Sequence, residues 1–262
     1  MKILKRAVIA IALIAAAASV FFFGYMRPRY VLPILMYHGV SDVEGTSLYV
    51  KPEVFARQME FLRDNGYKVI SLDEFVSGTR AGREFGAKTI VITFDDGFED
   101  NYLNAFPVLV KYRMPATIFL ITGYVGREKG YLNWDQVRVM YENGIDFGGH
   151  TRNNVYLPSA GGKAALEEEI EGPREDILSG LGAEAEYFCY PTGGFNEEIK
   201  NMVKAAGYKG ACTTNRGYDR YNRDLYELKR VKITNSDATR PFHFRAKLSG
   251  YYNLFRSLKN PE

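Results

Sequence analysis

The chain has 262 residues, of which 46% are hydrophobic and 14% aromatic, so it can bury the core of one large domain or two small ones. This composition excludes a chain that is disordered over most of its length. Three of the 34 basic residues lie in the first six positions and residues 7–26 carry no charge. Residues 27–262 therefore hold 31 basic and 31 acidic side chains, a balance that argues against nucleic acid as a partner.

The first 28 residues are predicted to be separate from the rest of the chain. As a helix, the uncharged segment 7–26 would span about 30 Å, the thickness of the apolar core of a bilayer. Basic residues before it favour an N-terminus on the cytoplasmic side. Small residues at 16–19 would also suit a cleaved signal sequence, but the apolar run continues beyond them. We therefore expect a membrane anchor over residues 1–28, with a cleaved signal as the alternative, and a globular domain over residues 29–262.

Strand-like and helix-like segments alternate through this domain. Strands are predicted at residues 31–37, 68–72, 89–94, 116–121, 145–149, 186–190, 208–213 and 228–233. Helices are predicted at residues 52–65, 100–112, 134–142, 164–181 and 196–206, with a short helical turn at 74–75. Apolar strands separated by helices indicate a parallel sheet covered on both faces. We expect an α/β fold, a distorted (β/α) barrel with seven or eight mostly parallel strands, and an open doubly wound sheet is the alternative.

Polar residues follow four of the predicted strands at the point where each strand ends. They are His38, the pair Asp95 and Asp96, His150, and the turn after Tyr190. In a parallel barrel these strand ends meet on one face, where active sites are built. An Asp-Asp-Gly sequence is also an ordinary turn, and a single histidine is more often structural. The concentration of such residues at strand ends is what indicates a site.

The residue types at these strand ends suit a hydrolytic metal centre. Asp96, His150 and Asn154 could hold a divalent cation, while Asp95 removes a proton from water. His150 and Asn154 stand four positions apart, so a helical turn would place them on one face. Histidine and carboxylate ligands suit zinc best, with nickel or cobalt as further options.

Three motifs in order resemble those of the polysaccharide deacetylases, the carbohydrate esterase family 4 with the NodB homology domain. Residues 93–97 (Thr-Phe-Asp-Asp-Gly) match the first motif, and residues 150–154 (His-Thr-Arg-Asn-Asn) resemble the second. Residues 188–193 (Phe-Cys-Tyr-Pro-Thr-Gly) resemble the third. The opening strand, residues 33–38 (Pro-Ile-Leu-Met-Tyr-His), resembles that of the subgroup with poly-N-acetylglucosamine deacetylases.

The resemblance implies a role for each matching residue. Asp95 would be the general base, and Asp96 and His150 would be metal ligands. His38 would be the general acid that protonates the leaving amine, since the early histidine of this subgroup is thought to replace a late one. The backbone N–H of Tyr190 would help to stabilise the oxyanion. The implied fold is the family's distorted (β/α) barrel.

Two positions depart from the family pattern. Asn154 stands where the second motif normally has another ligand histidine, and the third motif lacks an arginine that some members use to hold the catalytic aspartate. Arg230 could replace that arginine. Val231 and Ile233 share the face that suits the helix-packed outside of the barrel, so Arg230 would point inward. An exposed strand with ordinary surface charges is the alternative.

The expected activity is metal-dependent hydrolysis of N-acetyl groups from an amino-sugar polysaccharide or cell-envelope glycan. The alternatives are an O-acetyl glycan esterase and a metal-poor glycan-binding relative with little activity. We expect the domain to lie outside the cytoplasmic membrane, held by a single-pass anchor, or to be secreted or periplasmic after cleavage. No protein partner is predicted. Cys189 and Cys212 form no CxxC pair, which excludes a zinc site made of thiolates, and they are expected to be either two buried thiols or a disulfide.

Overall fold

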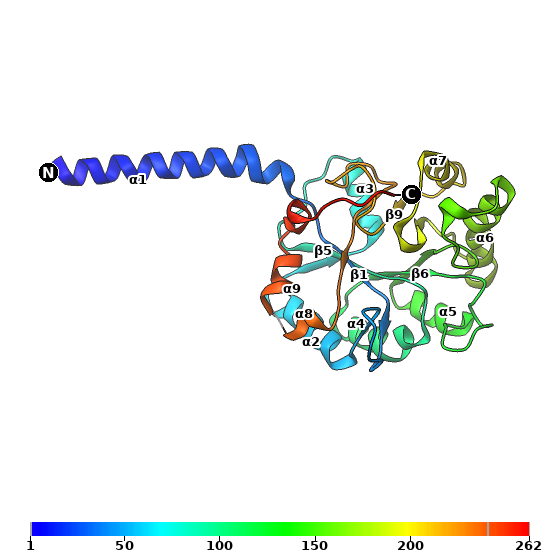
Figure 1. The fold of residues 1–262 in the computed structure, drawn as a ribbon. Coiled ribbons are helices and arrows are strands. Elements are labelled where there is room, and N and C mark those ends of the chain that lie inside the picture. The colour runs from blue at the N-terminus through cyan, green and yellow to red at the C-terminus, as the bar shows by residue number, and fades with distance from the viewer. Residues whose placement is uncertain (1, 240, 262) are drawn as a thin grey trace.

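The computed structural model describes residues 2–239 and 241–261, and its domain is built around one parallel sheet of eight strands (Figure 1). The strands follow one another in the order β10-β1-β5-β6-β7-β8-β9, and β4 pairs with the first half of β5. Their bounds are β1 Ile34–Tyr37, β4 Lys68–Ile70, β5 Thr89–Phe94, β6 Ala116–Leu120, β7 Ile145–Gly149, β8 Tyr187–Cys189, β9 Gly210–Cys212 and β10 Val231–Lys232. Every pairing in this sheet is parallel.

The sheet curls until its two ends are joined by the segment that leads into β10. The Leu228 N–H donates to the Ala211 carbonyl, and the Arg230 N–H donates to the Thr214 carbonyl, both at 2.9 Å. From the next residue, Val231, the same segment pairs with β1 as β10. This curled parallel sheet confirms the expected α/β barrel.

Side chains alternate between two hydrophobic cores. Val91 on β5 points into the core enclosed by the sheet, while Ile90 and Ile92 point into the core beneath the outer helices. Successive residues of a strand face opposite sides, so Thr93 and Asp95 continue the inward series of Val91. The strand pattern alone therefore directs the Asp95 carboxylate into the barrel.

Helices cover the outside of the sheet (Figure 1). Their bounds are α2 Pro52–Asp64, α3 Leu72–Arg80, α4 Phe106–Tyr112, α5 Trp134–Glu142, α6 Lys163–Leu181, α7 Glu197–Ala205, α8 Ser236–Thr239 and α9 Pro241–Lys247. Short 3-10 or π turns are η1 Phe22–Met26, η2 Arg27–Arg29, η3 Asn101–Ala105, η4 Leu157–Ser159, η5 Pro191–Gly193 and η6 Tyr252–Phe255. A separate two-stranded parallel sheet joins β2 Gly39–Val40 to β3 Tyr49–Val50, directly after the first predicted site residue.

The N-terminal helix α1 (Lys2–Phe21) extends away from the domain as a long rod (Figure 1). The stretch Leu4–Arg29 is long and apolar enough to cross a membrane, and a signal sequence would meet the same criteria. Its most apolar window buries no surface against the domain. The boundary expected between residues 28 and 29 stays a prediction.

Candidate active site

The carboxyl ends of β1, β5 and β7 bring four of the predicted residues together. The Nε2 atom of His38 lies 3.9 Å from Oδ2 of Asp95, and Nε2 of His150 lies 3.5 Å from Oδ1 of Asp96. All four side chains are at most 14% exposed. Two histidines and two carboxylates in so small a space form the centre of the candidate site.

A tight turn after β5 separates the two aspartates. The Asp95 N–H still donates to the Tyr37 carbonyl on β1, but Asp96 and Gly97 both adopt left-handed backbone angles, with φ of 73° and 75°. A Cβ atom at Gly97 would lie 2.7 Å from Cδ2 of the buried Leu120, so a larger residue would have to displace that side chain and would also strain the left-handed backbone. The turn lets Asp95 point into the barrel while its neighbour Asp96 lies against His150.

Arg230 holds Asp95 from inside the barrel. Its Nη1 and Nη2 atoms each donate to one carboxylate oxygen of Asp95 at 2.6 Å, and its Nε donates to the Thr213 carbonyl. Burial alone would raise the pKa of Asp95, but the buried guanidinium outweighs it and lowers that pKa far below its usual range. Arg230 therefore points into the barrel, as expected. Its contribution to catalysis stays a prediction.

His38 is positioned by its backbone. The side-chain amide of Asn101 donates to the His38 carbonyl at 2.8 Å, which fixes the end of β1 against η3. Burial lowers the pKa of His38, and the carboxylates of Asp95 and Asp96 only partly oppose this. His38 therefore rests mainly as the neutral imidazole at pH 7, able to accept a proton.

Asp96 and His150 fit a divalent cation. The Nδ1 atom of His150 is hydrogen bonded to the Cys189 carbonyl at 2.7 Å, which leaves Nε2 facing the Asp96 carboxylate. A ligand histidine commonly has its second nitrogen fixed in this way. Burial raises the pKa of Asp96, and the nearby His150 opposes this only in part, so a cation at this position would relieve a desolvated carboxylate.

A second group of possible ligands lies deeper in the barrel. Asp95, His150 and Cys189 place one ligand atom each within 4.8 Å of one another. However, both Asp95 oxygens already accept from Arg230, whose Nη2 also lies 3.0 Å from the Cys189 sulfur. Burial raises the pKa of the Cys189 thiol well above its usual value. A cation there would meet a guanidinium and a protonated thiol, so the pair Asp96 and His150 is the better site.

Asn154 does not lie on a helical turn with His150. The chain after β7 is an irregular loop, in which Thr151 and Asn154 have left-handed φ values of 60° and 59°. The Asn154 side chain is exposed, and asparagine is one of the few residues that adopts this conformation readily. The expected helical turn is therefore wrong, and the predicted ligand role of Asn154 rests on its motif position alone.

The backbone N–H of Tyr190 is already used. It donates to the Cys212 carbonyl on β9 at 3.0 Å, so it is not available to an oxyanion in this conformation. Two residues on, Thr192 lies within the turn η5 and has a left-handed φ of 53°. Because proline at position 191 has no N–H, Thr192 is the nearest following residue that can donate. Thr192 was not among the site residues predicted from the sequence.

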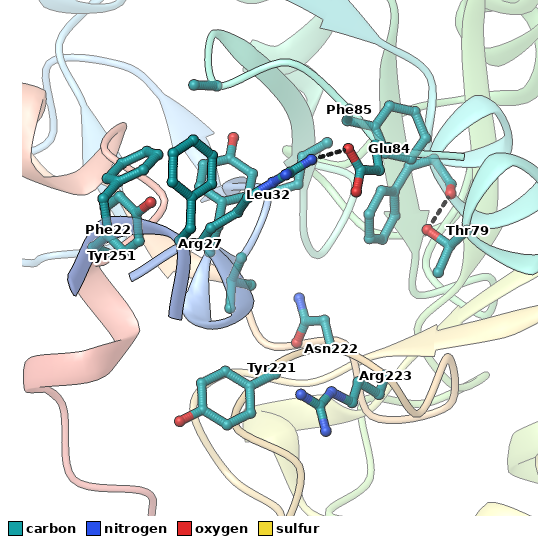
Figure 2. Close-up of a pocket in the computed structure, with 15 residues that line it drawn as sticks. Phe22, Arg27, Leu32, Thr79, Glu84, Phe85, Tyr221, Asn222, Arg223 and Tyr251 are labelled. Atoms are coloured by element: carbon teal, nitrogen blue, oxygen red, sulfur yellow. Dashed lines mark hydrogen bonds and ion pairs between the residues drawn. The ribbon is translucent and has the colours of Figure 1, made fainter. Parts of the chain in front are cut away.

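A cavity of the described structure lies away from these residues. It has a volume of about 470 Å³ and opens between the end of the N-terminal helical segment and the domain (Figure 2). Its lining includes Phe22, Leu32 and Phe85, of which the last two precede β1 and β5. It therefore lies at the amino ends of the strands, and the candidate site lies at their carboxyl ends. Arg27 pairs with Glu84 at its rim, at 2.5 Å (Figure 2).

Comparisons with known proteins point to one family. The family model for polysaccharide deacetylase matches residues 82–211. The chain is 34% identical over 203 residues to YxkH of Bacillus subtilis (strain 168), which is named as a polysaccharide deacetylase. The matched region covers 78% of this chain and 71% of the relative. It is 27% identical over 223 residues to the poly-beta-1,6-N-acetyl-D-glucosamine N-deacetylase of Staphylococcus aureus (strain MSSA476), covering 80% and 76% of the two chains. The solved structure of Streptococcus pyogenes deacetylase PplD in complex with acetate superposes with a TM-score of 0.74 at 27% identity, over 81% of this chain and 97% of that one.

Proposed function

This chain belongs to the polysaccharide deacetylase family, and from that premise we propose that it hydrolyses N-acetyl groups of an amino-sugar polysaccharide in the cell envelope. The observation that carries the proposal is the arrangement of Asp95, His38 and the pair Asp96 and His150 at the carboxyl ends of β1, β5 and β7. A carboxylate held ionised by Arg230, a neutral histidine 3.9 Å away and a cation site are the parts that amide hydrolysis needs.

The proposed reaction adds one water molecule to the acetamide. Asp95 accepts a proton as the water oxygen bonds to the acetyl carbon. The low pKa of Asp95 makes it a poor place for that proton to remain, so the proton moves on to the neutral His38. His38 then donates it to the amine nitrogen as the carbon–nitrogen bond breaks, which releases acetate and a free amino sugar.

The negative charge that develops on the carbonyl oxygen needs a donor. We assign this role to the N–H of Thr192 in place of that of Tyr190, because the Tyr190 N–H donates to Cys212. Tyr190 instead has a structural role in this proposal, since its buried ring stacks on Phe195 with 4.9 Å between the centroids.

Asp96 and His150 would hold the divalent cation, which when bound supplies Lewis-acid chemistry by polarising the acetyl carbonyl and lowering the pKa of water. Zinc is the proposed metal, and nickel or cobalt would suit the same imidazole and carboxylate ligands. Asn154 is retained as a proposed third ligand.

We further propose that α1 (Lys2–Phe21) anchors the domain to the cytoplasmic membrane, with the site on the extracytoplasmic side. Basic residues before the apolar stretch favour this orientation. Release by cleavage after residues 16–19 is the competing possibility.

Acetate release and metal content together test the proposed function. The purified full chain, loaded with zinc, should release acetate from N-acetylglucosamine oligomers faster than from O-acetylated glycans that lack N-acetyl groups. The reverse preference would identify an O-acetyl esterase. A chain that binds the oligomers but neither retains metal nor releases acetate would be a glycan-binding relative, and the proposal would be wrong.

A further inference from the structure

Four aromatic side chains form a continuous row beside the candidate site. The ring centroids of Tyr49 and Phe98 are 5.5 Å apart, those of Phe98 and Tyr131 are 5.1 Å apart, and those of Tyr131 and Tyr124 are 5.0 Å apart. The rings come from three segments of the chain: strand β3, the turn after the two aspartates, and the loop between β6 and α5. We call Tyr49, Phe98, Tyr131 and Tyr124 the aromatic row.

The aromatic row begins at the reacting groups. The Tyr49 ring lies over Gly39, where an added Cβ would be 2.3 Å from the ring, and Gly39 directly follows His38. Burial raises the pKa of both Tyr49 and Tyr131, and the Asp96 carboxylate adds to the increase in each case. Both hydroxyl groups therefore lie close enough to Asp96 to experience its charge.

Core packing does not explain the row. None of its four rings belongs to either hydrophobic core of the described residues, although 14 other partly buried hydrophobic side chains pack against the larger one. Each ring is instead partly exposed. Aromatic surface left accessible beside reactive groups is typical of a binding site.

We propose that the aromatic row binds the pyranose rings that flank the N-acetyl group being cleaved. One face of a pyranose presents C–H groups that pack on an aromatic ring, and its rim presents hydroxyl groups that pair with the tyrosine hydroxyls. A row of four rings is longer than one sugar, so the ligand class it suits is a chain of sugars. This inference rests on the proposed function, because it assigns the substrate of that same site.

The test compares Tyr131→Ala and Tyr131→Phe in the zinc-loaded full chain, each variant and the parent chain carrying Asp95→Asn so that the oligomers are bound but not hydrolysed. Calorimetry would measure binding of N-acetylglucosamine oligomers of two and six units, and metal content would be measured in parallel. We expect Tyr131→Ala to weaken binding of the hexamer by roughly 3- to 10-fold, the amount typical of one aromatic contact. Binding of the dimer should weaken less, and Tyr131→Phe should restore most of the hexamer affinity because the ring remains.

Tyr141→Ala is the matched control, since Tyr141 is an exposed tyrosine on α5 outside the row. Unchanged hexamer binding by Tyr131→Ala, or no binding of either oligomer by the unaltered chain, would overturn the inference. If Tyr131→Ala and Tyr141→Ala weaken hexamer binding equally, or if Tyr131→Ala alone loses metal, the role of Tyr131 is structural. Either result would also overturn the inference. Because binding is measured without turnover, a chain that binds through the row but releases no acetate would contradict the proposed function and leave this inference standing.

Discussion

Asp95 and Asp96 are neighbours in sequence, but their different surroundings should make their variants fail differently. Asp95→Asn removes the proton acceptor, so turnover should fall by about 10²–10⁴-fold while bound metal stays nearly unchanged. Asp96→Asn removes a proposed ligand, so both metal and turnover should be lost. Metal analysis and acetate release on the two purified variants check this, and equal metal loss in both would mean that the two roles are wrongly divided.

His38→Ala should reduce turnover without reducing metal content. The leaving amine needs a proton, and the His38 Nε2 atom is the imidazole nitrogen that lies 3.9 Å from Asp95. His243 is exposed on α9 and provides the control, because His243→Ala should keep normal turnover. If His38→Ala works at the normal rate and His243→Ala does not, the acid is His243.

Asn154 is where this chain departs from its family, and metal titration can decide what it does. An amide oxygen is a weaker donor to zinc than an imidazole nitrogen, so we expect Asn154→His to bind zinc about 10- to 100-fold more tightly than the unaltered chain. Asn154→Ala should bind it more weakly. Should the alanine variant bind zinc as tightly as the unaltered chain, Asn154 is only a turn residue, as its left-handed φ of 59° would suit.

The roles of single residues were only partly predictable from sequence. The inward direction of Arg230 followed from strand alternation, because Val231 and Ile233 had to face the helices. The occupied N–H of Tyr190 could not be foreseen, since its acceptor, the Cys212 carbonyl, belongs to another strand. Asn101, which holds the His38 carbonyl, had no motif to mark it.

At the scale of elements, contact between α5 and α6 depends on one glycine. A Cβ atom at Gly180 would lie 2.3 Å from the Trp134 ring, so this tryptophan packs closely against α6 at that position. Gly180→Ala should lower the free energy of unfolding by about 1–3 kcal/mol through overpacking, despite the better helix propensity of alanine. Denaturant unfolding followed by the fluorescence of Trp134, the one tryptophan in the chain, measures this.

Gly161→Ala is the control for that measurement, because no atom lies within 4 Å of a Cβ placed at Gly161. Its free energy of unfolding should stay within about 0.5 kcal/mol of the unaltered chain. A Gly180→Ala variant as stable as this control would show that the two helices can move apart at no cost.

The first and last residues of an element were predicted correctly where the sequence marks its ends with turn or capping residues. The bounds of short elements were not. β5 (Thr89–Phe94) ends at Asp-Asp-Gly, and α5 (Trp134–Glu142) starts at an Asn133 capping box and stops before Asn-Gly, so both bounds were predicted correctly. The strand expected at 228–233 is reduced to Val231–Lys232, because its first half bonds to β9. The small sheet of β2 and β3 was missed, since two-residue strands carry no periodicity.

For the whole molecule, the position of the N-terminal helix predicts how the protein fractionates. The full chain should stay with membranes after a carbonate wash, whereas a chain starting at residue 29 should be soluble, because the uncharged stretch is removed. Antibody detection in each fraction checks this. Recovery of a product that starts near residue 20 from the medium or periplasm would show instead that the stretch is a cleaved signal.

The chain enters the barrel at the amino end of β1, and the reacting groups lie at the opposite ends of the strands. β5 has six residues, so about 20 Å of sheet separates the two ends at about 3.3 Å per residue. An anchored enzyme built this way would work at a set height above the bilayer. A sugar would then have to extend about that far from the point where the chain enters the barrel to reach the site. The length of the barrel would then select substrates by their distance from the bilayer.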